Sequence, residues 1–555
     1  MEVDLITDVL VIGGGSAGCM AAIKAKHANP SLRVTVAEKA HAKRSGSISR
    51  GMDGMNIVAV PGISSSEEYV ESMRIRCDGI LDEELCYLMA AESYSIVKEL
   101  EAWGVSFTKD DSGNYQLLKV HPKGRFLLPM VAPDLKVILL EQMQKAGVDI
   151  MNHTMAISLS SNDQRVTGAT FLNTRTGDIL SIEAKSTILA TGPAGRFGLP
   201  SSGYLYGTYE CPANSGDGYY LGYHAGAELT GFEYTMRSFL IKDFNGPLWY
   251  IVTTRGGKVF NGLGQELAAD HLSSNRLISD VVVNEVHDGR GPIYMQLKHL
   301  SEETIEELEG VLFTTERPTQ KKFFAGREID FRKDWIELEQ SEVYLCSGHG
   351  ITGLVVDANA MTSLEGLLAA GDVAAVPMQH LTGAFVFGSI AGETAAKIAS
   401  ALKTEAVERK SSGHDRVNSI LSQRGSIQLS SFEHKLRRMI SQYLPSPKNE
   451  MRLRTVLSWI ERFRNNFLNL AVRDSHELGR ALELESIMDC AEMSAKASIE
   501  RRESRWGLVH FRTDFPERDN QNYLKHIMIK KDQDTGQMTL FSRPPQANGR
   551  RRECL

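Results

Sequence analysis

A glycine-rich turn near the start of the chain limits more strongly than any other feature what this sequence can fold into. Residues 8–12 read Asp-Val-Leu-Val-Ile, an apolar and β-branched run typical of a buried parallel strand. Gly13, Gly15 and Gly18 follow in the spacing G-x-G-x-x-G, and residues 19–26 continue as a small-residue helix. The first glycine permits a tight turn, the second lets the backbone approach a pyrophosphate, and the third lets helix and strand pack closely. This order predicts a phosphate site at a helix N-terminus, where free N–H groups and a partial positive charge attract anions.

A second strand, followed by an acidic residue, extends the prediction to a dinucleotide. Residues 33–37 read Arg-Val-Thr-Val-Ala and end at Glu38, twenty positions beyond Gly18. An acidic side chain at this distance accepts hydrogen bonds from an adenosine ribose, and it disfavours a ribose that carries a 2′-phosphate. The alternative is an ordinary strand–helix–strand unit without a ligand. Strand, glycines, helix and acid together favour the dinucleotide.

Length and charge narrow the class of protein. At 555 residues the chain is too long for one hydrophobic core, so we expect about two to four domains. The net charge is −7 with acids and bases interspersed, so we expect no nucleic acid partner. No apolar run reaches the length of a transmembrane segment. Residues 1–4 are not the basic start of a signal peptide, and we expect a cytoplasmic protein.

The cysteines argue against a metal or cluster held by this chain alone. All seven are scattered, and no C-x-x-C pair occurs. A disulfide framework, a zinc site and an iron–sulfur cluster are therefore not expected here. If electrons pass through an iron–sulfur cluster, another subunit must carry it.

Periodicity predicts the elements that follow the glycine turn. We expect helices over residues 82–103, 134–145, 302–312, 432–444, 451–470 and 474–500, the last three as a bundle, and strands over 149–159, 165–173, 179–183 and 186–190. Residues 411–418 read as a linker, and residues 537–555 as a tail that is disordered or wraps a partner. Residues 186–193 form a buried strand that ends in a glycine turn and follows a β-rich insertion. They are either one more sheet strand or the sign of a flavin-binding fold with two dinucleotide-type segments.

Several segments, in the order in which they occur, resemble the succinate dehydrogenase/fumarate reductase flavoprotein family. These segments are residues 214–218, 225–229 with Glu233, 350–357, 366–372, 387–392, 502–506, 512–516 and 519–526. Residues 214–218, for example, read Asn-Ser-Gly-Asp-Gly where the family has N-T-G-D-G. Within this family, residues 44–48, 242–247, 289–295, 503–506 and 511–516 resemble the α subunit of adenylylsulfate reductase.

The resemblance implies an α/β fold with a Rossmann-like FAD-binding domain and an inserted α+β capping domain. The FAD-binding domain would span residues 1–230 and return at 346–405, with the capping domain at 231–345. A C-terminal helical bundle would follow at 420–500 and an extension at 501–555.

The resemblance also implies FAD as the cofactor. Its pyrophosphate would lie over the glycine turn, and its isoalloxazine between the loop from Ser45 and the segment from Gly371. The implied cofactor-binding residues are Gly13, Gly15, Ser16, Ala17, Gly18, Glu38, Lys39, Ser45, Gly46, Ser47, Ala156, Ala190, Thr191, Gly192, Asp217, Gly371, Asp372, Gly383 and Ala384. Gly46 stands where succinate dehydrogenases carry the histidine that bonds covalently to the flavin. A glycine has no side chain for that bond, so we expect non-covalent FAD.

The catalytic residues follow less directly, because the substrate clamp departs from the family pattern. In fumarate reductases a capping-domain arginine donates the proton, and a histidine with further arginines binds the carboxylates. The candidates here are Arg276, Arg255, His349 and His380. Either histidine contacts substrate or is structural. The arginine of the family's R-G-E-G-G element falls on Thr253, and the nucleotide-binding arginine of adenylylsulfate reductase on Thr235. These departures argue against a C4-dicarboxylate and against adenylylsulfate as substrate.

We therefore expect the catalytic flavoprotein subunit of an adenylylsulfate reductase/fumarate reductase-like complex. It would move electrons between a small-molecule substrate at the flavin and a small, ferredoxin-like iron–sulfur subunit. The basic run Arg452, Arg454, Arg462 and Arg464 is either a solvated helix face or a docking surface for that subunit. Two alternatives remain, a single-subunit oxidase resembling L-aspartate oxidase and a non-catalytic electron-transfer flavoprotein.

Overall fold

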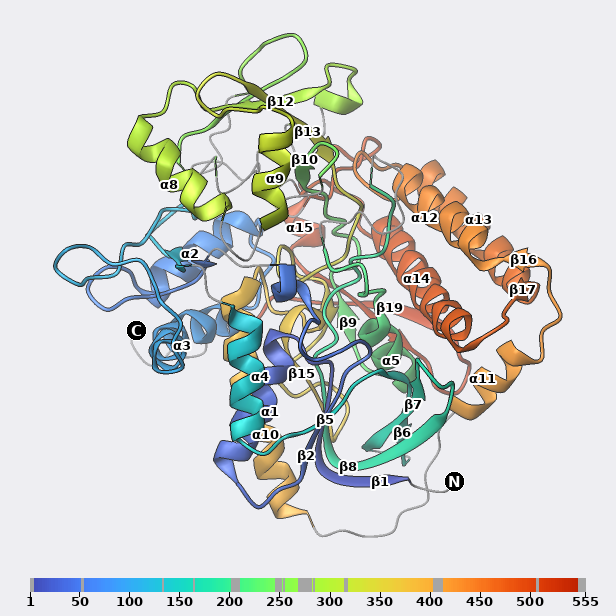
Figure 1. Ribbon diagram of the computed structural model, residues 1–555. Helices are drawn as coiled ribbons and strands as arrows, with labels where there is room; N and C mark the ends of the chain where they lie inside the picture. Colours follow the sequence, from blue (N-terminus) through green and yellow to red (C-terminus); the bar gives the residue numbers. More distant parts are fainter. Residues whose placement is uncertain are drawn as a thin grey trace.

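The parallel strand predicted from residues 8–12 lies at the centre of the largest sheet (Figure 1). The computed structural model describes residues 4–50, 54–131, 134–162, 165–200, 210–244, 252, 255–267, 282, 285–313, 318–402, 413–505 and 509–547. Its seven-stranded sheet has the order β5-β2-β1-β8-β7-β6, with β15 also paired to β8. The strands are β1 (Leu5–Ile12), β2 (Val34–Ala37), β5 (Asp149–Met151), β6 (Thr154–Ser161), β7 (Val166–Asn173), β8 (Ile179–Leu189) and β15 (Leu367–Ala369). A parallel β5-β2-β1-β8 core confirms the predicted α/β class.

Strand β8 corrects the expectation of two separate strands at 179–183 and 186–190. It is one strand of eleven residues. Its first half pairs antiparallel with β7, as Gly168 with Glu183, and its later half pairs parallel with β15, as Thr187 with Leu367. Glu183 and Lys185 are half-buried and alternate with buried neighbours, as the side chains of one continuous strand do. β8 thereby joins the antiparallel hairpin region to the parallel dinucleotide-binding core.

Helix α1 (Ser16–Ala28) packs against the large sheet, α10 (His380–Ala401) and α4 (Leu135–Lys145). Further helices along the chain are α2 (Ser66–Arg76), α3 (Glu83–Ala102) and α5 (Asp217–Ala225), with 3₁₀ turns at Ser47–Arg50 and Gly371–Val373. α1 and α10 approach so closely that a Cβ on Gly388 would lie 2.6 Å from the carbonyl oxygen of Ala17. On Gly392 it would lie 2.2 Å from that of Ala21. The two helices therefore meet along a seam in which Gly388 and Gly392 of α10 leave room for the backbone of α1.

A second hydrophobic core lies in the segment inserted between α5 and β14 (Gly353–Leu354). It is built on a four-stranded sheet of order β10-β13-β12-β11. Its elements are β10 (Phe239–Ile241), β11 (Lys258–Phe260), β12 (Ile293–Gln296), β13 (Trp335–Gln340), α8 (Glu302–Leu312) and α9 (Pro318–Gly326). Helix α8 confirms the helix predicted over 302–312. This unit stands at the top of the view in Figure 1, beyond the end of the large sheet.

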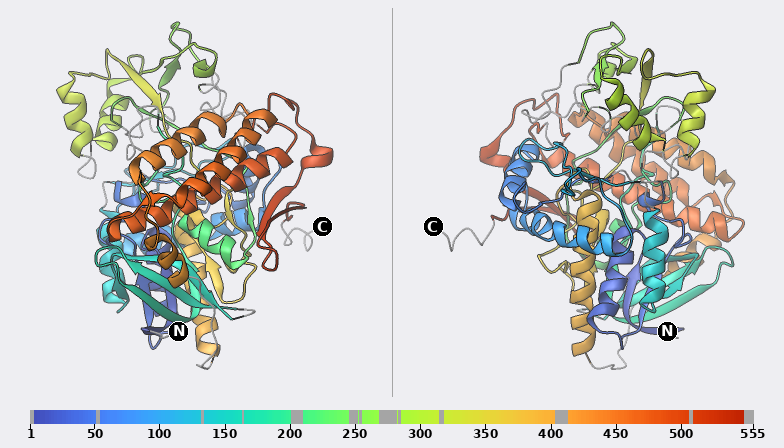
Figure 2. Two further views of the ribbon diagram at one scale, coloured as in Figure 1. Left: turned by 90° about the vertical axis from the view of Figure 1, so that its right-hand side faces the viewer. Right: turned by 60° about the vertical axis from the view of Figure 1, so that its left-hand side comes forward.

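The C-terminal part contains three long helices that pack against one another. The predicted helices are present as α12 (Leu429–Tyr443), α13 (Glu450–Phe467) and α14 (Ser475–Glu500), and Figure 2 shows them running side by side. The linker prediction is wrong for residues 413–418, because α11 (Gly413–Leu421) is a helix with Val417 and Ile420 buried on one face. Residues 411 and 412 lie outside the described part. Short strands β16 (Ile427–Gln428) and β17 (Leu470–Ala471) pair beside the bundle.

The C-terminal segment adds a hairpin to a further four-stranded sheet of order β14-β9-β18-β19. Besides β14, its strands are β9 (Leu229–Thr230), β18 (His526–Lys531) and β19 (Met538–Arg543), and the short helix α15 (Asn520–Tyr523) precedes β18. Elsewhere, β3 (Gly54–Met55) pairs with β4 (Leu128–Pro129). The tail prediction is thus wrong for 538–543, which pair with β18, while residues 548–555 lie outside the described part. Among the helices that the structure describes, none combines the length and apolar character that crossing a membrane requires.

A cluster of buried charges fixes the segment after α14. Glu503 accepts hydrogen bonds from Arg501 at 2.7 Å, from Arg505 at 2.5 Å and from the backbone N–H of Asp519 at 2.8 Å. Arg501 also donates to Glu233 at 2.9 Å. All four of these charged side chains are fully buried. Because buried charges are tolerated only when paired and hydrogen-bonded, Glu503 is a central acceptor of the C-terminal fold.

Candidate functional site

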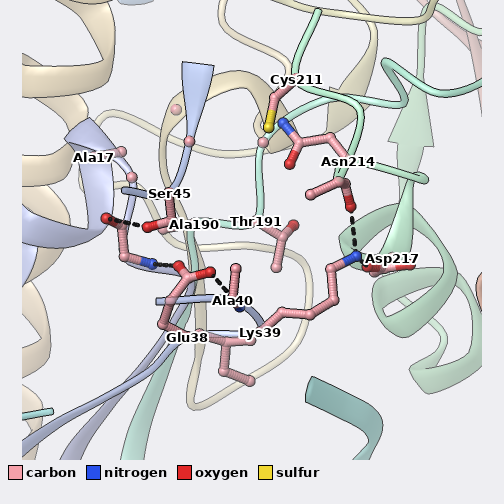
Figure 3. A pocket seen from close by; sticks show the side chains of 18 of the residues that line it. Ala17, Glu38, Lys39, Ala40, Ser45, Ala190, Thr191, Cys211, Asn214 and Asp217 are labelled. Carbon is pink, nitrogen blue, oxygen red and sulfur yellow. Dashed lines mark hydrogen bonds and ion pairs between the residues drawn. The ribbon is translucent and has the colours of Figure 1, made fainter. Parts of the chain in front are cut away.

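The glycine turn connects the end of β1 to the start of α1 and lies against Ala190, which follows β8. Figure 3 shows Ala17 and Ala190 in this part of the cavity wall. Gly13 has φ +105°, and a Cβ there would lie 2.4 Å from the carbonyl oxygen of Ala190. A Cβ on Gly18 would lie 1.9 Å from the carbonyl oxygen of Gly13. At Gly15, by contrast, the nearest heavy atom is the Cα of Gly46 at 4.0 Å. Gly13 and Gly18 are therefore required for packing, whereas Gly15 keeps the space in front of the helix N-terminus open.

The Glu38 carboxylate is fixed beside this turn. Its Oε2 accepts the backbone N–H of Gly14 at 2.7 Å, and its Oε1 accepts that of Ala40 at 2.8 Å. Figure 3 shows the carboxylate held between these two groups. Each carboxylate oxygen has a second lone pair, so the side chain can still accept hydrogen bonds from the hydroxyls of a ribose.

A single cavity unites the segments that the sequence related to FAD. Of the predicted cofactor residues, it is lined by Gly13, Gly15, Ser16, Ala17, Glu38, Lys39, Ser45, Gly46, Ser47, Ala156, Ala190, Thr191, Gly192, Asp217, Gly371, Asp372 and Ala384. Additional lining residues include Gly14, Arg44, Met155, Cys211, Asn214 and Leu221. A cavity lined by an acidic side chain, an open helix N-terminus and several glycines fits the charge and chemistry of FAD.

Two of the predicted cofactor residues, Gly18 and Gly383, do not appear among the described residues that line the cavity. A Cβ on Gly383 would lie 2.3 Å from the Cβ of Gln379 and 2.5 Å from the Sδ of Met89. Gly383 is therefore needed for the packing of α10 against α3. Both glycines therefore affect the cavity indirectly, because they allow the close packing of α1 and α10 beside it.

Asp372, which lines the cavity, belongs to a cluster of titratable side chains. Its carboxylate lies so near Gly348 that a Cβ there would be 2.5 Å from Oδ1. His349 Nδ1 lies 3.5 Å from Glu210 Oε1, and the rings of His349 and His380 meet edge to face at 5.0 Å. The two predicted histidines are thus adjacent to each other within this cluster. Glu210 was not predicted, because nothing near it in sequence marks it.

The pKa values of this cluster are pushed apart. Burial disfavours the imidazolium of His349, but its ion pair with Glu210 outweighs burial and raises the His349 pKa. Burial, with His349 next, lowers the pKa of His380 well below its usual value. Burial and then the Glu210 carboxylate raise the pKa of Asp372 to about 7. These shifts give His349 a higher affinity for a proton than the adjacent His380, a pairing suited to proton transfer.

Two further basic groups, missed from the sequence, influence His380 electrostatically. Arg76 ends α2, and His121 is buried with Nε2 3.0 Å from the carbonyl oxygen of Asn56. Burial, with Arg76 next, lowers the pKa of His121 to about 3. A signal for α2 was available, since Ser65 and Glu68 form a capping box, but nothing in sequence indicated where its last residue would point.

The catalytic candidates from the predicted capping domain are not among the described residues that line the cavity. Arg255 donates to Glu307 of α8 at 2.9 Å, and this contact lies within the capping unit. Arg276 and Thr253 lie outside the described residues. Thr235, at the position of the adenylylsulfate reductase arginine, is buried. Arg290 donates to Glu285 at 2.7 and 2.8 Å and has a structural role in its turn.

A metal ion is one occupant to consider at the cluster, because ligand atoms of Glu210, Cys346 and His349 all lie within 4.8 Å of one another. Burial raises the pKa of the Cys346 thiol well above its usual value. The thiol also accepts the N–H of Gly348 at 3.1 Å. Metals bind cysteine as the thiolate, so this protonated thiol is a poor ligand.

The raised pKa of Asp372 makes stability depend on pH in a definite direction. The folded protein keeps the Asp372 proton up to about pH 7, whereas an unfolded chain releases it near about pH 4. The folded state therefore loses relative stability as the pH rises through this interval. The Asp372→Asn variant lacks this proton, so its unfolding free energy should fall over the interval by roughly 1–3 kcal/mol less than that of the unchanged protein. Urea denaturation of the flavin-free proteins at the two ends of the interval measures it.

The control is Asp534→Asn in the exposed turn between β18 and β19. It should follow the unchanged protein at both pH values. Equal pH dependence for Asp372→Asn and the unchanged protein would show that Asp372 ionises normally.

Comparison with known proteins yields two matching family models and several relatives. The model described as an FAD binding domain matches residues 8–385, and the one described as the fumarate reductase flavoprotein C-terminal region matches residues 433–549. An uncharacterized FAD-dependent oxidoreductase of Methanocaldococcus jannaschii is 27% identical, covering 94% of this chain and 96% of that protein. A fumarate reductase (CoM/CoB) chain of Methanothermobacter marburgensis, named as one of that enzyme's subunits, is 25% identical, covering 92% and 94%. The solved adenylylsulfate reductase of Archaeoglobus fulgidus is 25% identical, with a TM-score of 0.87 over 98% of this chain and 96% of that one.

Proposed function

We propose that this chain is the catalytic subunit of a two-component enzyme. The chain belongs to the succinate dehydrogenase/fumarate reductase flavoprotein family and is an FAD-dependent oxidoreductase. It moves electrons between a small-molecule substrate at the flavin and an iron–sulfur partner. The observation that carries the proposal is the cavity itself. Segments from residue 12 to residue 384 line it, and its lining residue Asp372 belongs to the same cluster as the His349–His380 pair.

When bound, FAD supplies the redox step, and the residues of the chain supply position and protons. We assign pyrophosphate binding to the turn from Gly13 to Ala17 and ribose binding to Glu38. His349, whose pKa the Glu210 ion pair raises against burial, is the group that would hold a proton at its ring beside Asp372. Arg276, Arg255 and His380 remain the candidates for binding substrate from the capping side and from α10.

Non-covalent attachment of FAD is supported by the backbone at Gly46. Its φ is +76°, and a Cβ there would lie 3.0 Å from the Cα of Gly15. The position therefore disfavours any side chain, including the histidine that would form a covalent bond.

The substrate class is narrowed by the residues that replace the family's clamp. Thr235 and Thr253 stand where arginines of the related enzymes bind anionic substrate groups. Neither threonine provides the charged, two-pronged contact of an arginine. The substrate is accordingly a small molecule other than a C4-dicarboxylate or adenylylsulfate.

The partner is inferred from the chain's own cysteines and from its relatives. Relatives in this family are named as subunits. The seven cysteines contain no C-x-x-C pair from which a cluster could be built. A small iron–sulfur protein is therefore the electron donor or acceptor we propose.

The test begins with the purified protein. We expect a yellow protein whose flavin leaves completely on acid precipitation, as absorbance and fluorescence of the supernatant would measure. Flavin that stays with the pellet would refute the non-covalent assignment. Substrate-reduced protein should reoxidise slowly in air and rapidly with an added ferredoxin-type iron–sulfur protein. Rapid reoxidation in air alone would favour a single-subunit oxidase, and no bleaching across a broad substrate panel would favour an electron-transfer flavoprotein.

A further inference from the structure

Glu483 on α14 is one side chain by which the C-terminal helical bundle reaches the wall of the cofactor cavity. This carboxylate is buried, with 6% of the residue exposed. Its Oε1 lies 2.8 Å from the Nζ of Lys39, the residue that follows Glu38 in the cavity wall. Its Oε2 accepts a hydrogen bond from Arg196. The two residues Lys39 and Glu483 are thus a contact between the start of the chain and its C-terminal third.

The Lys39 ammonium has its three hydrogens accounted for within the protein. It donates to the carbonyl oxygen of Ala213 at 2.5 Å, to Asp217 at 2.5 Å and to Glu483 at 2.8 Å. An ammonium has three donors and no acceptor. In this arrangement Lys39 can contact a ligand only through its backbone or its methylene groups. Its head group instead fixes Ala213 and Asp217, which both line the cavity (Figure 3).

The contact is anchored in a larger network of buried charges. Arg196 donates to the carbonyl oxygen of Pro212 at 3.2 Å and lies 3.4 Å from Glu433 of α12. Glu433 in turn pairs with Arg437 at 3.1 Å and with Arg480. Burial opposes ionisation of Glu483, but Arg196 and Lys39 outweigh it and lower the Glu483 pKa to about 2. The carboxylate is therefore charged at neutral pH, and it is shared by Lys39, Arg196 and, at 3.6 Å, Arg480.

We propose that Glu483 is a positioning residue for FAD, by which the C-terminal helical bundle completes the cofactor cavity. Glu483 holds the Lys39 head group in place, and Lys39 holds the Ala213–Asp217 segment at the start of α5. Loss of the carboxylate leaves Lys39 and Arg196 short of an acceptor in a buried place, and both must shift toward the cavity wall. Cofactor binding and docking of the bundle are consequently linked, and each stabilises the other.

The test compares Glu483→Gln with Glu485→Gln in the full-length protein. Glu485 lies two positions along α14 and pairs with Arg416 at 2.7 Å, so it matches the loss of an ion pair on the same helix. FAD affinity is measured by fluorescence titration of the flavin-free proteins, and thermal unfolding is recorded in parallel. We expect Glu483→Gln to weaken FAD binding by roughly tenfold or more and Glu485→Gln to leave it unchanged.

A double variant separates positioning from general destabilisation. If Glu483 acts through Lys39, then Lys39→Met combined with Glu483→Gln binds FAD no more weakly than Lys39→Met alone. Equal FAD affinity of the two single glutamate variants, or additive losses in the double variant, would overturn the proposal. Failure of the unchanged protein to bind FAD would instead contradict the cofactor assignment. The outcome does not depend on which substrate the enzyme uses.

Discussion

Gly15→Val is expected to abolish practical FAD binding while leaving the fold intact. The backbone at Gly15 is in an extended conformation open to any residue, and the nearest atom to an added Cβ is 4.0 Å away. The valine would nevertheless fill the space in front of the α1 N-terminus, where the pyrophosphate approaches the backbone. We expect FAD affinity to fall at least about 100-fold, or about 2.7 kcal/mol. Fluorescence titration of the flavin-free protein measures the loss, and its circular dichroism checks the fold.

Two further glycine variants make this result specific. Gly310→Val changes an exposed position of α8, where an added Cβ would meet nothing within 4 Å. This variant should bind FAD normally. Gly18→Val should instead fail to fold, because its Cβ would lie 1.9 Å from the carbonyl oxygen of Gly13. Normal FAD affinity in Gly15→Val would mean that the pyrophosphate does not lie over this turn.

The second large effect is expected at Glu503. Glu503→Gln keeps the volume of the side chain but removes the charge that Arg501 and Arg505 share. Two buried guanidinium groups would then face a neutral amide, and removing one partner of a buried pair costs about 3–5 kcal/mol. We expect a loss of unfolding free energy in that range, measured by urea denaturation. The effect should be the same with and without FAD, since none of these residues lines the cavity in the described part of the chain.

Glu450→Gln provides the matched control. Its ion pair with Arg454 on α13 has the same chemistry but is exposed. Exposed ion pairs contribute at most about 1 kcal/mol. If both variants lost the same small amount, water would have to reach Glu503, and the C-terminal segment would be packed more loosely than the structure shows.

The glycine-turn part of the cofactor cavity could be foreseen because it is local in sequence, whereas the other lining segments, as far as residue 384, were implied by the family resemblance. A strand, a glycine turn and a helix are recognisable from periodicity and from residues that only a tight turn requires, as at Gly13 and Gly18. The same applies to α8 and to the helices of the bundle. Strand β8 was divided wrongly, since one continuous strand of eleven residues runs through both predicted segments.

The substrate end of the site could not be foreseen in the same way. Glu210, Arg76 and His121 come from three separate segments and meet His349 and His380 only through the fold. The Lys39–Glu483 contact joins residues 444 positions apart. Spacing rules describe what one element presents, and such contacts depend on how elements pack together.

The seam between α1 and α10 has a consequence for the order in which the protein can be made. α1 leaves the ribosome early, yet the helix whose glycines fit its backbone, and β15 beside β8, are synthesised far later. Until then the N-terminal strand and helix have an apolar face without its partner. Because domains cannot close before their distant segments arrive, the early chain must wait in an open form that is exposed to aggregation. A truncated product ending before α10 should therefore accumulate as insoluble material instead of as a smaller flavoprotein.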